Sequence, residues 1–343
     1  MRAAFLHKAG DVRIETVADP SPGEGEVLVR VRSVGVCGSD VHYYAHGRIG
    51  EFVVRAPQIL GHEAAGELAK VGHGVEELKE GDRVAIEPGI PCERCETCRE
   101  GLYNLCPDVQ FLGTPPVQGA YREYLSYPAK WCHRLPEGMS FDEGAMIEPL
   151  AIGVFALDEA PIRAGESAAV FGCGPIGLVI LEAAHAAGAG RVYVSEPIDA
   201  RRRKALALGA TATFDPQEKD PVEAILAATG GRGVDLAVEA AGAPDTYGQA
   251  VSVTRRNGTT LFVGIPEEDE VAIPAHKARR YAITIKNLRR FRGTYDRAID
   301  LVQRGKADVA SLVTHRFPLE EIDKAFRLVQ GHEDGVIRAM IEV

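Results

Sequence analysis

The chain has 343 residues, enough for two domains, and its composition is ordinary for a globular protein, with 45% hydrophobic and 26% charged side chains. Its net charge of −10 argues against nucleic acid or an anionic membrane as a general partner. No apolar run approaches the roughly 18 residues that span a bilayer, and residues 1–8 lack the apolar core of a signal peptide. We therefore expect a cytoplasmic protein whose seven cysteines are metal ligands or buried thiols rather than disulfides.

Residues 1 to about 90 have a β-rich, glycine-punctuated pattern, in which 27–31 is the clearest strand. Two stretches within this region are dense in metal-binding residue types, one around Cys37 and one at His62-Glu63. Zinc takes cysteine sulfur, histidine nitrogen and carboxylate oxygen, and a catalytic site keeps one position open. Spacing alone leaves two interpretations open: the residues meet at a metal, or Cys37 is a buried thiol and His62 a core histidine.

Four closely spaced cysteines follow: Cys92, Cys95, Cys98 and Cys106. Such a set suits a closed, all-thiolate structural zinc site. The bacterial ferredoxin motif, which binds an iron–sulfur cluster, has three residues before its last cysteine, whereas this chain has seven. We therefore predict a structural zinc lobe that braces a loop or a subunit contact and has no catalytic role.

The strand pattern returns between residues 119 and 136, with 120–125 as the clearest strand, and we place Trp131 and Cys132 in the core. Glu148 then stands directly before a proline in an apolar segment. A buried carboxylate there is costly unless it is paired or near a metal. The alternative is an exposed acid at a helix start.

Residues 167–196 have the features of a dinucleotide-binding unit. A predicted strand over 168–171 leads into Gly172-x-Gly174-x-x-Gly177, then a helix over 178–187 and a strand over 192–194 that ends at Glu196. The three glycines would allow the tight turn, the approach of a pyrophosphate and close helix packing. The pyrophosphate would lie at the helix N-terminus, and the carboxylate would bind a ribose 2′-hydroxyl.

Strands and helices alternate beyond this point, which predicts a doubly wound parallel sheet with helices on both faces. After about residue 289 the pattern becomes helical, and the final strand need not belong to the dinucleotide sheet. The predicted strands are 212–214, 234–238, 260–263, 282–285 and 336–341, and the predicted helices are 221–229, 245–255, 295–304 and 319–330.

Taken together, these residues resemble the zinc-dependent medium-chain dehydrogenase/reductase superfamily, specifically its polyol (sorbitol/xylitol) dehydrogenase branch. The resemblance implies an α/β fold in three parts: a mostly-β GroES-like catalytic domain over 1–150, a Rossmann NAD-binding domain over 151–289, and a segment over 290–343 that returns to the catalytic domain. The motifs that carry it are Gly61-His-Glu-x2-Gly66-x5-Gly72-x2-Val75, Cys37-Gly-Ser-Asp-Val-His-Tyr43, Gly47-Arg-Ile-Gly50, Ala85-Ile-Glu-Pro-Gly89, Glu148-Pro-Leu150 and Val313-Thr-His-Arg-Phe-Pro318.

The resemblance implies oxidation of a secondary alcohol of a polyol to the ketose, by hydride transfer to NAD. Cys37, His62 and Glu63 would hold a catalytic zinc with a water, and Glu148 would orient that water or bind the metal directly. The metal would lower the pKa of the substrate hydroxyl. Ser39 would take the first proton, and His42 would pass it towards solvent.

The implied cofactors are one catalytic and one structural zinc per chain, and NAD. The carboxylate of Glu196 accepts from a 2′-hydroxyl and repels a 2′-phosphate, which favours NAD, although Arg201, Arg202 and Arg203 could pair with the phosphate of NADP. The implied cofactor-binding residues are Gly172, Gly174, Pro175, Ile176, Gly177, Glu196, Arg201, Gly264, Ile265 and Phe291. The implied substrate-lining residues are Tyr43, Phe111, Thr114, Glu148 and Arg292.

Two departures from the branch, Gly293 after Phe291-Arg292 and Tyr44 in place of a tryptophan, weaken the case for sorbitol itself. L-Threonine 3-dehydrogenase and 2,3-butanediol dehydrogenase are the alternatives with the same chemistry. A non-catalytic nucleotide-binding scaffold or a nucleic-acid binder are alternatives of other classes, and they would hold one zinc rather than two. The family further implies a homo-oligomer, a tetramer or a dimer.

Overall fold

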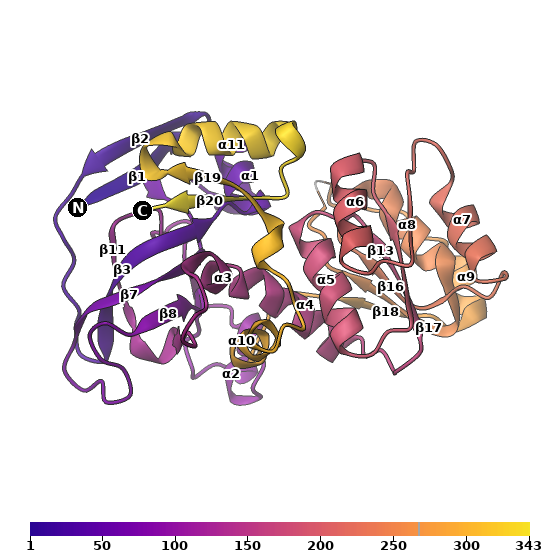
Figure 1. The fold of residues 1–343 in the computed structure, drawn as a ribbon, viewed down its shortest axis with the longest axis horizontal. Helices are drawn as coiled ribbons and strands as arrows, with labels where there is room; N and C mark the ends of the chain where they lie inside the picture. Colours follow the sequence, from indigo (N-terminus) through magenta and orange to yellow (C-terminus); the bar gives the residue numbers. More distant parts are fainter. Residues whose placement is uncertain (267) are drawn as a thin grey trace. The chain divides into compact units, whose positions relative to one another are not determined.

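The computed structural model describes residues 1–266 and 268–343, and the chain divides into two compact units (Figure 1). The first unit consists of Met1–Glu148, Ala298–Gln303 and Val309–Val343. The second consists of Pro149–Arg297 and Arg304–Asp308. The chain therefore returns to the first unit after leaving the second, and each unit is described by itself below.

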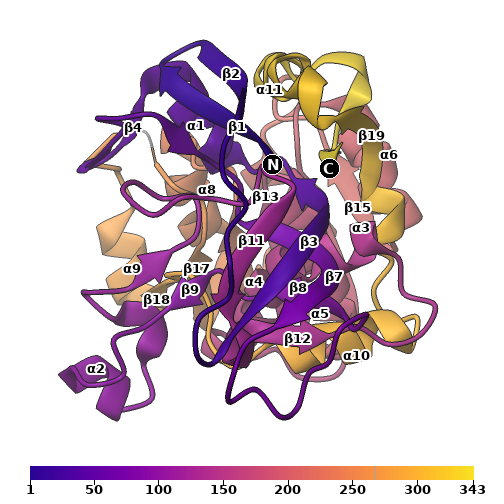
Figure 2. The same ribbon diagram turned by 90° about the vertical axis from the view of Figure 1, so that its left-hand side faces the viewer.

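The first unit is built on a seven-stranded sheet with the order β12-β8-β7-β3-β20-β19, in which β11 also pairs with β3 (Figure 2). Val27, Val29 and Val31 alternate with more exposed residues along β3, so one face of the strand enters the core. The sheet strands are β3 (Glu26–Gly35), β7 (Glu63–Val71), β8 (Arg83–Ile86), β11 (Tyr124–Pro128), β12 (Cys132–Arg134), β19 (Val313–Pro318) and β20 (Arg338–Glu342).

Smaller sheets complete the unit. One has the order β2-β1-β6, and two further pairs are β9 with β10 and β4 with β5. These strands are β1 (Arg2–Lys8), β2 (Asp11–Thr16), β4 (Arg48–Ile49), β5 (Phe52–Val53), β6 (Gln58–Ile59), β9 (Gly89–Ile90) and β10 (Gln110–Phe111).

Short helices surround the sheets of the first unit. Tyr44 in α1 packs on Phe326 in α11 with ring centroids 5.0 Å apart, and its hydroxyl donates to Asp323 at 2.7 Å. The aromatic residue that departs from the family pattern therefore joins two helices inside the unit. The helices are α1 (Gly38–His46), α2 (Glu96–Arg99), α3 (Phe141–Ala145) and α11 (Ile322–Gly331), and α10 (Tyr295–Gln303) and α4 (Ile147–Glu159) run across the unit boundaries.

The second unit is a six-stranded parallel sheet with the order β15-β14-β13-β16-β17-β18. The strand order reverses direction between β13 and β16, which is where a doubly wound sheet binds its ligand. The strands are β13 (Ser167–Phe171), β14 (Arg191–Ser195), β15 (Ala212–Phe214), β16 (Val234–Glu239), β17 (Thr254–Phe262) and β18 (Thr284–Asn287). The helices are α5 (Pro175–Ala186), α6 (Asp199–Ala207), α7 (Pro221–Ala228), α8 (Pro244–Val253) and α9 (Ala275–Tyr281). Among the described helices of the whole chain, none combines the length and the apolar character required to cross a membrane.

Several predicted elements differ from the structure in their bounds. β17 begins at Thr254 rather than at 260, β20 begins at Arg338 rather than at 336, and α5 begins at Pro175 rather than at 178. The strand predicted over 120–125 begins only at Tyr124, as β11, because the N–H groups of Ala120 and Tyr121 donate to the carbonyls of Gly61 and Leu60. The strand predicted over 282–285 begins two residues later, because Ala282 is left-handed, with φ of 52°, and ends α9. The helix predicted over 319–330 begins at Ile322, after a short 3₁₀ turn.

Candidate functional site

The first candidate metal centre lies in the first unit and is formed by Cys37, His62 and Glu63, whose ligand atoms lie within 4.8 Å of one another. Cys37 precedes α1, and Glu63 begins β7 opposite Gly35 on β3. A Cβ atom on Gly35 would lie 2.1 Å from Oε2 of Glu63, so only glycine leaves room for this carboxylate. The pairing of β3 with β7 thus brings together two motifs that lie about 25 residues apart.

Glu63 is a buried carboxylate whose ion-pair partner is Arg338. The side chain is 0% exposed, and neither carboxylate oxygen accepts an aligned hydrogen bond within residues 1–266 and 268–343. Nη1 of Arg338 lies 2.8 Å from Oε2 as an ion pair, while this nitrogen donates to the carbonyl of Val36 at 2.7 Å. Burial disfavours the charge on Arg338, but the neighbouring Glu63 and Cys37 outweigh it and raise the pKa of the guanidinium.

Two further acids lie in the field of Glu63. Burial, reinforced by Glu63, raises the pKa of the Cys37 thiol to about 12. Burial also raises the pKa of Glu148 to about 8; His62 opposes this rise and Glu63 adds to it. The buried acids of this group therefore disfavour one another's ionised forms. A thiol, an imidazole and a carboxylate whose ligand atoms lie together fit a zinc ion, whereas the carboxylate of Glu148 is not part of the 4.8 Å group.

Asp40 organises the backbone around these ligands. It is 1% exposed, and it accepts hydrogen bonds from the N–H groups of Cys37 and Gly61 at 3.1 Å and from the hydroxyl of Tyr121 at 3.0 Å. Its Oδ1 also lies 3.7 Å from Nδ1 of His62. A carboxylate on one imidazole nitrogen leaves the other nitrogen for a metal. Sequence reasoning read Asp40 only as part of a motif.

The residues expected to move protons lie on the first turns of α1. The Ser39 side chain lies close enough to the Cys37 thiol to oppose the rise that burial causes in the pKa of that thiol. His42 is half-buried, and its ring centroid lies 5.5 Å from that of His46. Ser39 therefore lies beside the metal-ligand group, while His42 lies one turn further along the helix.

The residues expected to line the substrate are divided between the units. In the first unit, the ring of Phe111 lies 5.4 Å from that of His62, the N–H of Thr114 donates to the carbonyl of Phe111, and Tyr43 is buried in α1. Arg292 belongs to the second unit, where its guanidinium lies 4.9 Å from the ring centroid of Phe155 and 3.4 Å from a carboxylate oxygen of Glu159.

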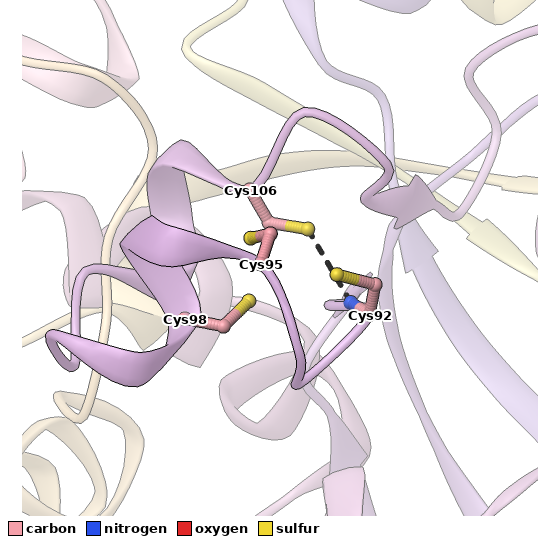
Figure 3. A group of neighbouring side chains, drawn as sticks. All are labelled: Cys92, Cys95, Cys98 and Cys106. Atoms are coloured by element: carbon pink, nitrogen blue, oxygen red, sulfur yellow. Dashed lines mark hydrogen bonds between the residues drawn. The ribbon is translucent and has the colours of Figure 1, made fainter.

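The second candidate metal centre is the cysteine lobe, drawn in Figure 3. The four sulfur atoms lie within 4.8 Å of one another, and the N–H of Cys92 donates to the sulfur of Cys106 at 3.3 Å. All seven cysteines are free thiols. Four thiols at this spacing suit a tetrahedral zinc ion without an open position. The set is Cys92, Cys95, Cys98 and Cys106.

The glycine-rich turn joins β13 to α5 in the second unit. Gly172 has φ of 87°, and a Cβ atom on Gly177 would lie 2.0 Å from the carbonyl oxygen of Gly172. Gly174 is the N-cap of α5, and Pro175 occupies its first turn beside Ile176. Proline suits this position because it lacks an N–H that the helix would leave unbonded. The turn and the helix N-terminus form the cradle that a pyrophosphate requires.

Glu196 follows β14 and is 3% exposed. Its two oxygens accept hydrogen bonds from the N–H groups of Cys173 at 2.7 Å and Ile198 at 3.0 Å, which fixes the carboxylate next to the glycine-rich turn. Nη1 of Arg201 would lie 3.7 Å from a Cβ atom on Gly174, so this arginine lies over the same turn.

The neighbouring arginines have other partners. Arg202 donates to the carbonyls of Glu196 and Pro197 and pairs with Asp215 at 2.9 Å. Arg203 pairs with Asp199, also at 2.9 Å. Three further predicted cofactor residues lie in the same unit. Gly264 and Ile265 follow β17, Ile265 is 61% exposed, and Phe291 is buried with its ring 5.5 Å from that of Tyr295.

Sequence reasoning missed Arg338, Tyr121 and Gly35 as parts of the first metal centre. An arginine in an apolar terminal strand was the one available signal for Arg338, because a cation buried in a strand needs an acid beside it. Nothing in the sequence indicates that Tyr121 reaches Asp40, since 81 residues separate them.

Comparison with known proteins places this arrangement in a family. Residues 23–137 match the alcohol dehydrogenase GroES-like domain, and residues 175–304 match the zinc-binding dehydrogenase domain. The chain is 40% identical to sorbitol dehydrogenase of Bacillus subtilis, over 99% of this chain and 97% of that one. It is 42% identical to sorbitol dehydrogenase of Gallus gallus, over 96% and 94%.

The solved structures agree with these relatives. The structure of 2R,3R-butanediol dehydrogenase from Bacillus subtilis superimposes with a TM-score of 0.91 at 34% identity, covering 100% of this chain and 99% of that one. Together with the parallel sheet and the two ligand groups, these likenesses identify the chain as an oxidoreductase that uses zinc and a nicotinamide cofactor. It belongs to the zinc-dependent medium-chain dehydrogenase/reductase superfamily, in the polyol dehydrogenase branch.

Proposed function

We propose that the chain oxidises a secondary alcohol of a polyol to the ketose and transfers the hydride to NAD. The observation that carries this proposal is the group formed by Cys37, His62 and Glu63, which brings three donor types that zinc binds within 4.8 Å of one another. Relatives named sorbitol dehydrogenase over nearly the full length support a polyol as the substrate class.

We assign the catalytic zinc to Cys37, His62 and Glu63, and a second, structural zinc to the four-cysteine lobe. Glu148 is proposed as a nearby group that orients the fourth ligand, because its pKa responds to the charges of the other three residues while its oxygens lie outside their 4.8 Å group. Bound zinc supplies a Lewis acid that lowers the pKa of an alcohol, and NAD supplies the hydride acceptor.

The residues of the chain orient the reactants and move the proton. The proposed first acceptor is Ser39, whose hydroxyl already contacts the sulfur of Cys37, and His42 would pass the proton towards solvent. Asp40 would hold the imidazole of His62 in one orientation. Phe111, whose ring lies against His62, would keep one side of the centre dry.

NAD rather than NADP is proposed because of Glu196. Its carboxylate is buried and fixed by two N–H groups, so a 2′-phosphate would meet a negative charge that cannot move aside. Arg202 and Arg203 are engaged with Asp215 and Asp199, so they are poorly placed to compensate. Arg201 is then proposed to contact the cofactor over the glycine-rich turn.

The second candidate function is oxidation of a vicinal diol such as 2,3-butanediol. The close superposition with 2R,3R-butanediol dehydrogenase favours it.

The test is the initial rate of NAD and NADP reduction on zinc-replete protein with sorbitol, xylitol, galactitol, ribitol, 2,3-butanediol, ethanol and L-threonine. The expected result is NAD-linked oxidation with a preference for one polyol. Activity confined to butanediol or threonine would contradict the polyol assignment. Cys37→Ser should abolish activity, and Cys132→Ser is the matched control, because Cys132 is also buried in the first unit but lies outside both ligand groups.

We further propose that the first unit is the catalytic domain and the second the NAD-binding domain, which follows from the residues that each contains. A homo-oligomer is proposed on the family resemblance, and a cytoplasmic location on the seven free thiols. Light scattering and cell fractionation test these two points.

A further inference from the structure

Glu239 is a buried acid at the carboxyl end of β16 that the proposed chemistry does not use. It is 0% exposed, and in the sheet it lies between Phe171 of β13 and Phe262 of β17. The reversal of strand order falls between β13 and β16, so this residue stands at the edge where a dinucleotide binds.

One oxygen of Glu239 shapes the turn that leads into α8. Oε1 accepts hydrogen bonds from the N–H groups of Ala241 and Gly242, both at 2.8 Å. The Thr246 hydroxyl lies 2.8 Å from the same oxygen and 2.6 Å from the carbonyl of Ala243, so its single proton is shared between them. The carboxylate thus supplies an acceptor for N–H groups at the start of a helix that have no partner within it.

The other oxygen contacts the turn after β17. Oε2 is buried and has no hydrogen-bond partner among residues 1–266 and 268–343, and a Cβ atom on Gly264 would lie 2.4 Å from it. The two turns also touch each other, because a Cβ atom on Gly242 would lie 2.5 Å from the carbonyl oxygen of Ile265. The hydroxyl of Tyr247 donates to the carbonyl of Gly264 at 3.0 Å. A single carboxylate therefore sets the spacing of both turns.

The position of these turns indicates which half of the cofactor they serve. A doubly wound sheet binds the two halves of a dinucleotide on the two sides of the reversal point. Glu196, after β14, lies on the side that takes the adenosine ribose. The turns after β16 and β17 lie on the opposite side, which leaves them for the nicotinamide nucleotide.

We infer that Glu239 is a positioning residue that holds turns 240–243 and 263–265 in the shape that accepts the nicotinamide half of the cofactor. The inference rests on the proposed function, because it requires a bound nicotinamide nucleotide. Glutamate suits this position because all the groups around Oε1 are donors. Glutamine would keep an acceptor for those donors only by placing its NH₂ group at the buried position of Oε2, against the backbone of Gly264.

The test compares Glu239→Gln with a matched control on the same strand. Asp235 lies near the opposite end of β16, is 8% exposed, and accepts hydrogen bonds from the N–H and hydroxyl of Ser167 at 2.9 Å. Asp235→Asn therefore also removes a buried, hydrogen-bonded acid of this strand, but away from the reversal point. NADH binding is measured by nicotinamide fluorescence, ADP-ribose binding by calorimetry, and folding by thermal unfolding.

The expected result is a loss of NADH affinity without a comparable loss of ADP-ribose affinity. Glu239→Gln should weaken NADH binding about tenfold, which corresponds to about 1.4 kcal/mol, and leave the affinity for ADP-ribose within about twofold. Asp235→Asn should lower the thermal midpoint and leave both affinities unchanged. Unaltered NADH binding in Glu239→Gln, an equal loss of ADP-ribose binding, or the same selective loss in Asp235→Asn would overturn the inference.

A second variant and the binding affinities of the unmodified protein separate a failure of this inference from a failure to fold or of the proposed function. If Glu239→Gln does not fold, Gly264→Ala perturbs the same contact from the other turn and should produce the same selective loss; ordinary NADH affinity in that variant would overturn the inference. If the unmodified protein binds ADP-ribose but not NADH, or neither, the proposed function fails, whereas a failure confined to the variants leaves that function standing.

Discussion

Glu182 gives a stability prediction with a definite dependence on pH. It lies in the middle of α5 and is 5% exposed. One carboxylate oxygen accepts a hydrogen bond from the N–H of Asp308, and the other is buried without a partner among the described residues. Burial raises the pKa of Glu182 from 4.5 to about 7; the N–H of Asp308 opposes the rise, the charge of Asp308 adds to it, and Lys204 opposes it.

Proton linkage gives the direction in which stability changes with pH. The folded protein holds the proton of Glu182 more tightly than the unfolded chain, so its contribution to stability is fully present below pH 4.5 and is lost as the pH rises through about 7. The difference between the two pKa values corresponds to about 3 kcal/mol, of which about 2.5 kcal/mol falls between pH 5 and pH 8. At about 2–4 °C per kcal/mol, this is a change of roughly 5–10 °C in the thermal midpoint.

The assay compares thermal unfolding of the unmodified protein and Glu182→Gln at pH 5, 6, 7 and 8. Glutamine keeps an acceptor for the N–H of Asp308 and cannot ionise, so the midpoint of the variant relative to the parent should rise steadily with pH. Any fixed cost of burying the amide shifts all four points equally. Glu223→Gln, at an exposed position of α7, is the control and should show no trend. A constant difference between Glu182→Gln and its parent from pH 5 to pH 8 would contradict a raised pKa of Glu182 in the folded protein.

Three further perturbations test the first unit. Arg338→Met should lower the free energy of unfolding of the metal-free protein by about 3–5 kcal/mol in urea, because Glu63 would stay buried without its cation. Cys98→Ser should lower the zinc content from about two ions per chain to about one by mass spectrometry, because a tetrahedral site needs all four sulfurs. Gly66→Ala should destabilise the unit by about 1–3 kcal/mol or more, because the new Cβ atom would lie 2.3 Å from the carbonyl oxygen of Arg30 in the paired strand.

Each of these has a control. A loss below about 1 kcal/mol for Arg338→Met would show that Glu63 is neutral in the metal-free protein. Cys132→Ser should retain the full zinc content, and an unchanged content in Cys98→Ser would contradict the structural site. Gly38→Ala is the match for Gly66→Ala, because a Cβ atom on Gly38 meets nothing within 4 Å; equal losses in the two variants would mean that steric contact is not the cause.

The accuracy of the sequence predictions depends on how local each signal is. The glycine-rich turn and the four-cysteine set could be predicted from the sequence, because each of these motifs lies within about 30 residues. The strand predicted over 120–125 starts too early, because the N–H groups of residues 120 and 121 bond to residues 61 and 60, a partner that no local pattern indicates. Pairing of β3 with β7 brings Cys37 to Glu63, so residue types alone left their meeting open.

Long-range electrostatic partners were the least predictable part of the site. Arg338 balances the charge of Glu63 although the two residues lie near opposite ends of the sequence. Tyr121 contacts Asp40, from which 81 positions in the sequence separate it. Glu239 gave no signal either, because a glutamate at the end of an apolar strand is ordinary in sequence and becomes informative only when both of its oxygens are found buried between two turns.

The last strand gives the metal centre an unusual place in the order of synthesis. β20 inserts between β3 and β19, and it carries Arg338, the cation beside Glu63. Glu63 leaves the ribosome about 275 residues earlier, which at about 5–20 residues per second is a delay of roughly 15–55 s. During that interval the nascent sheet has the candidate metal ligands but lacks Arg338 and a central strand. A stop codon that removes only the final six residues would therefore remove the cation beside Glu63, although the residues proposed to bind the metal all lie in the first 150.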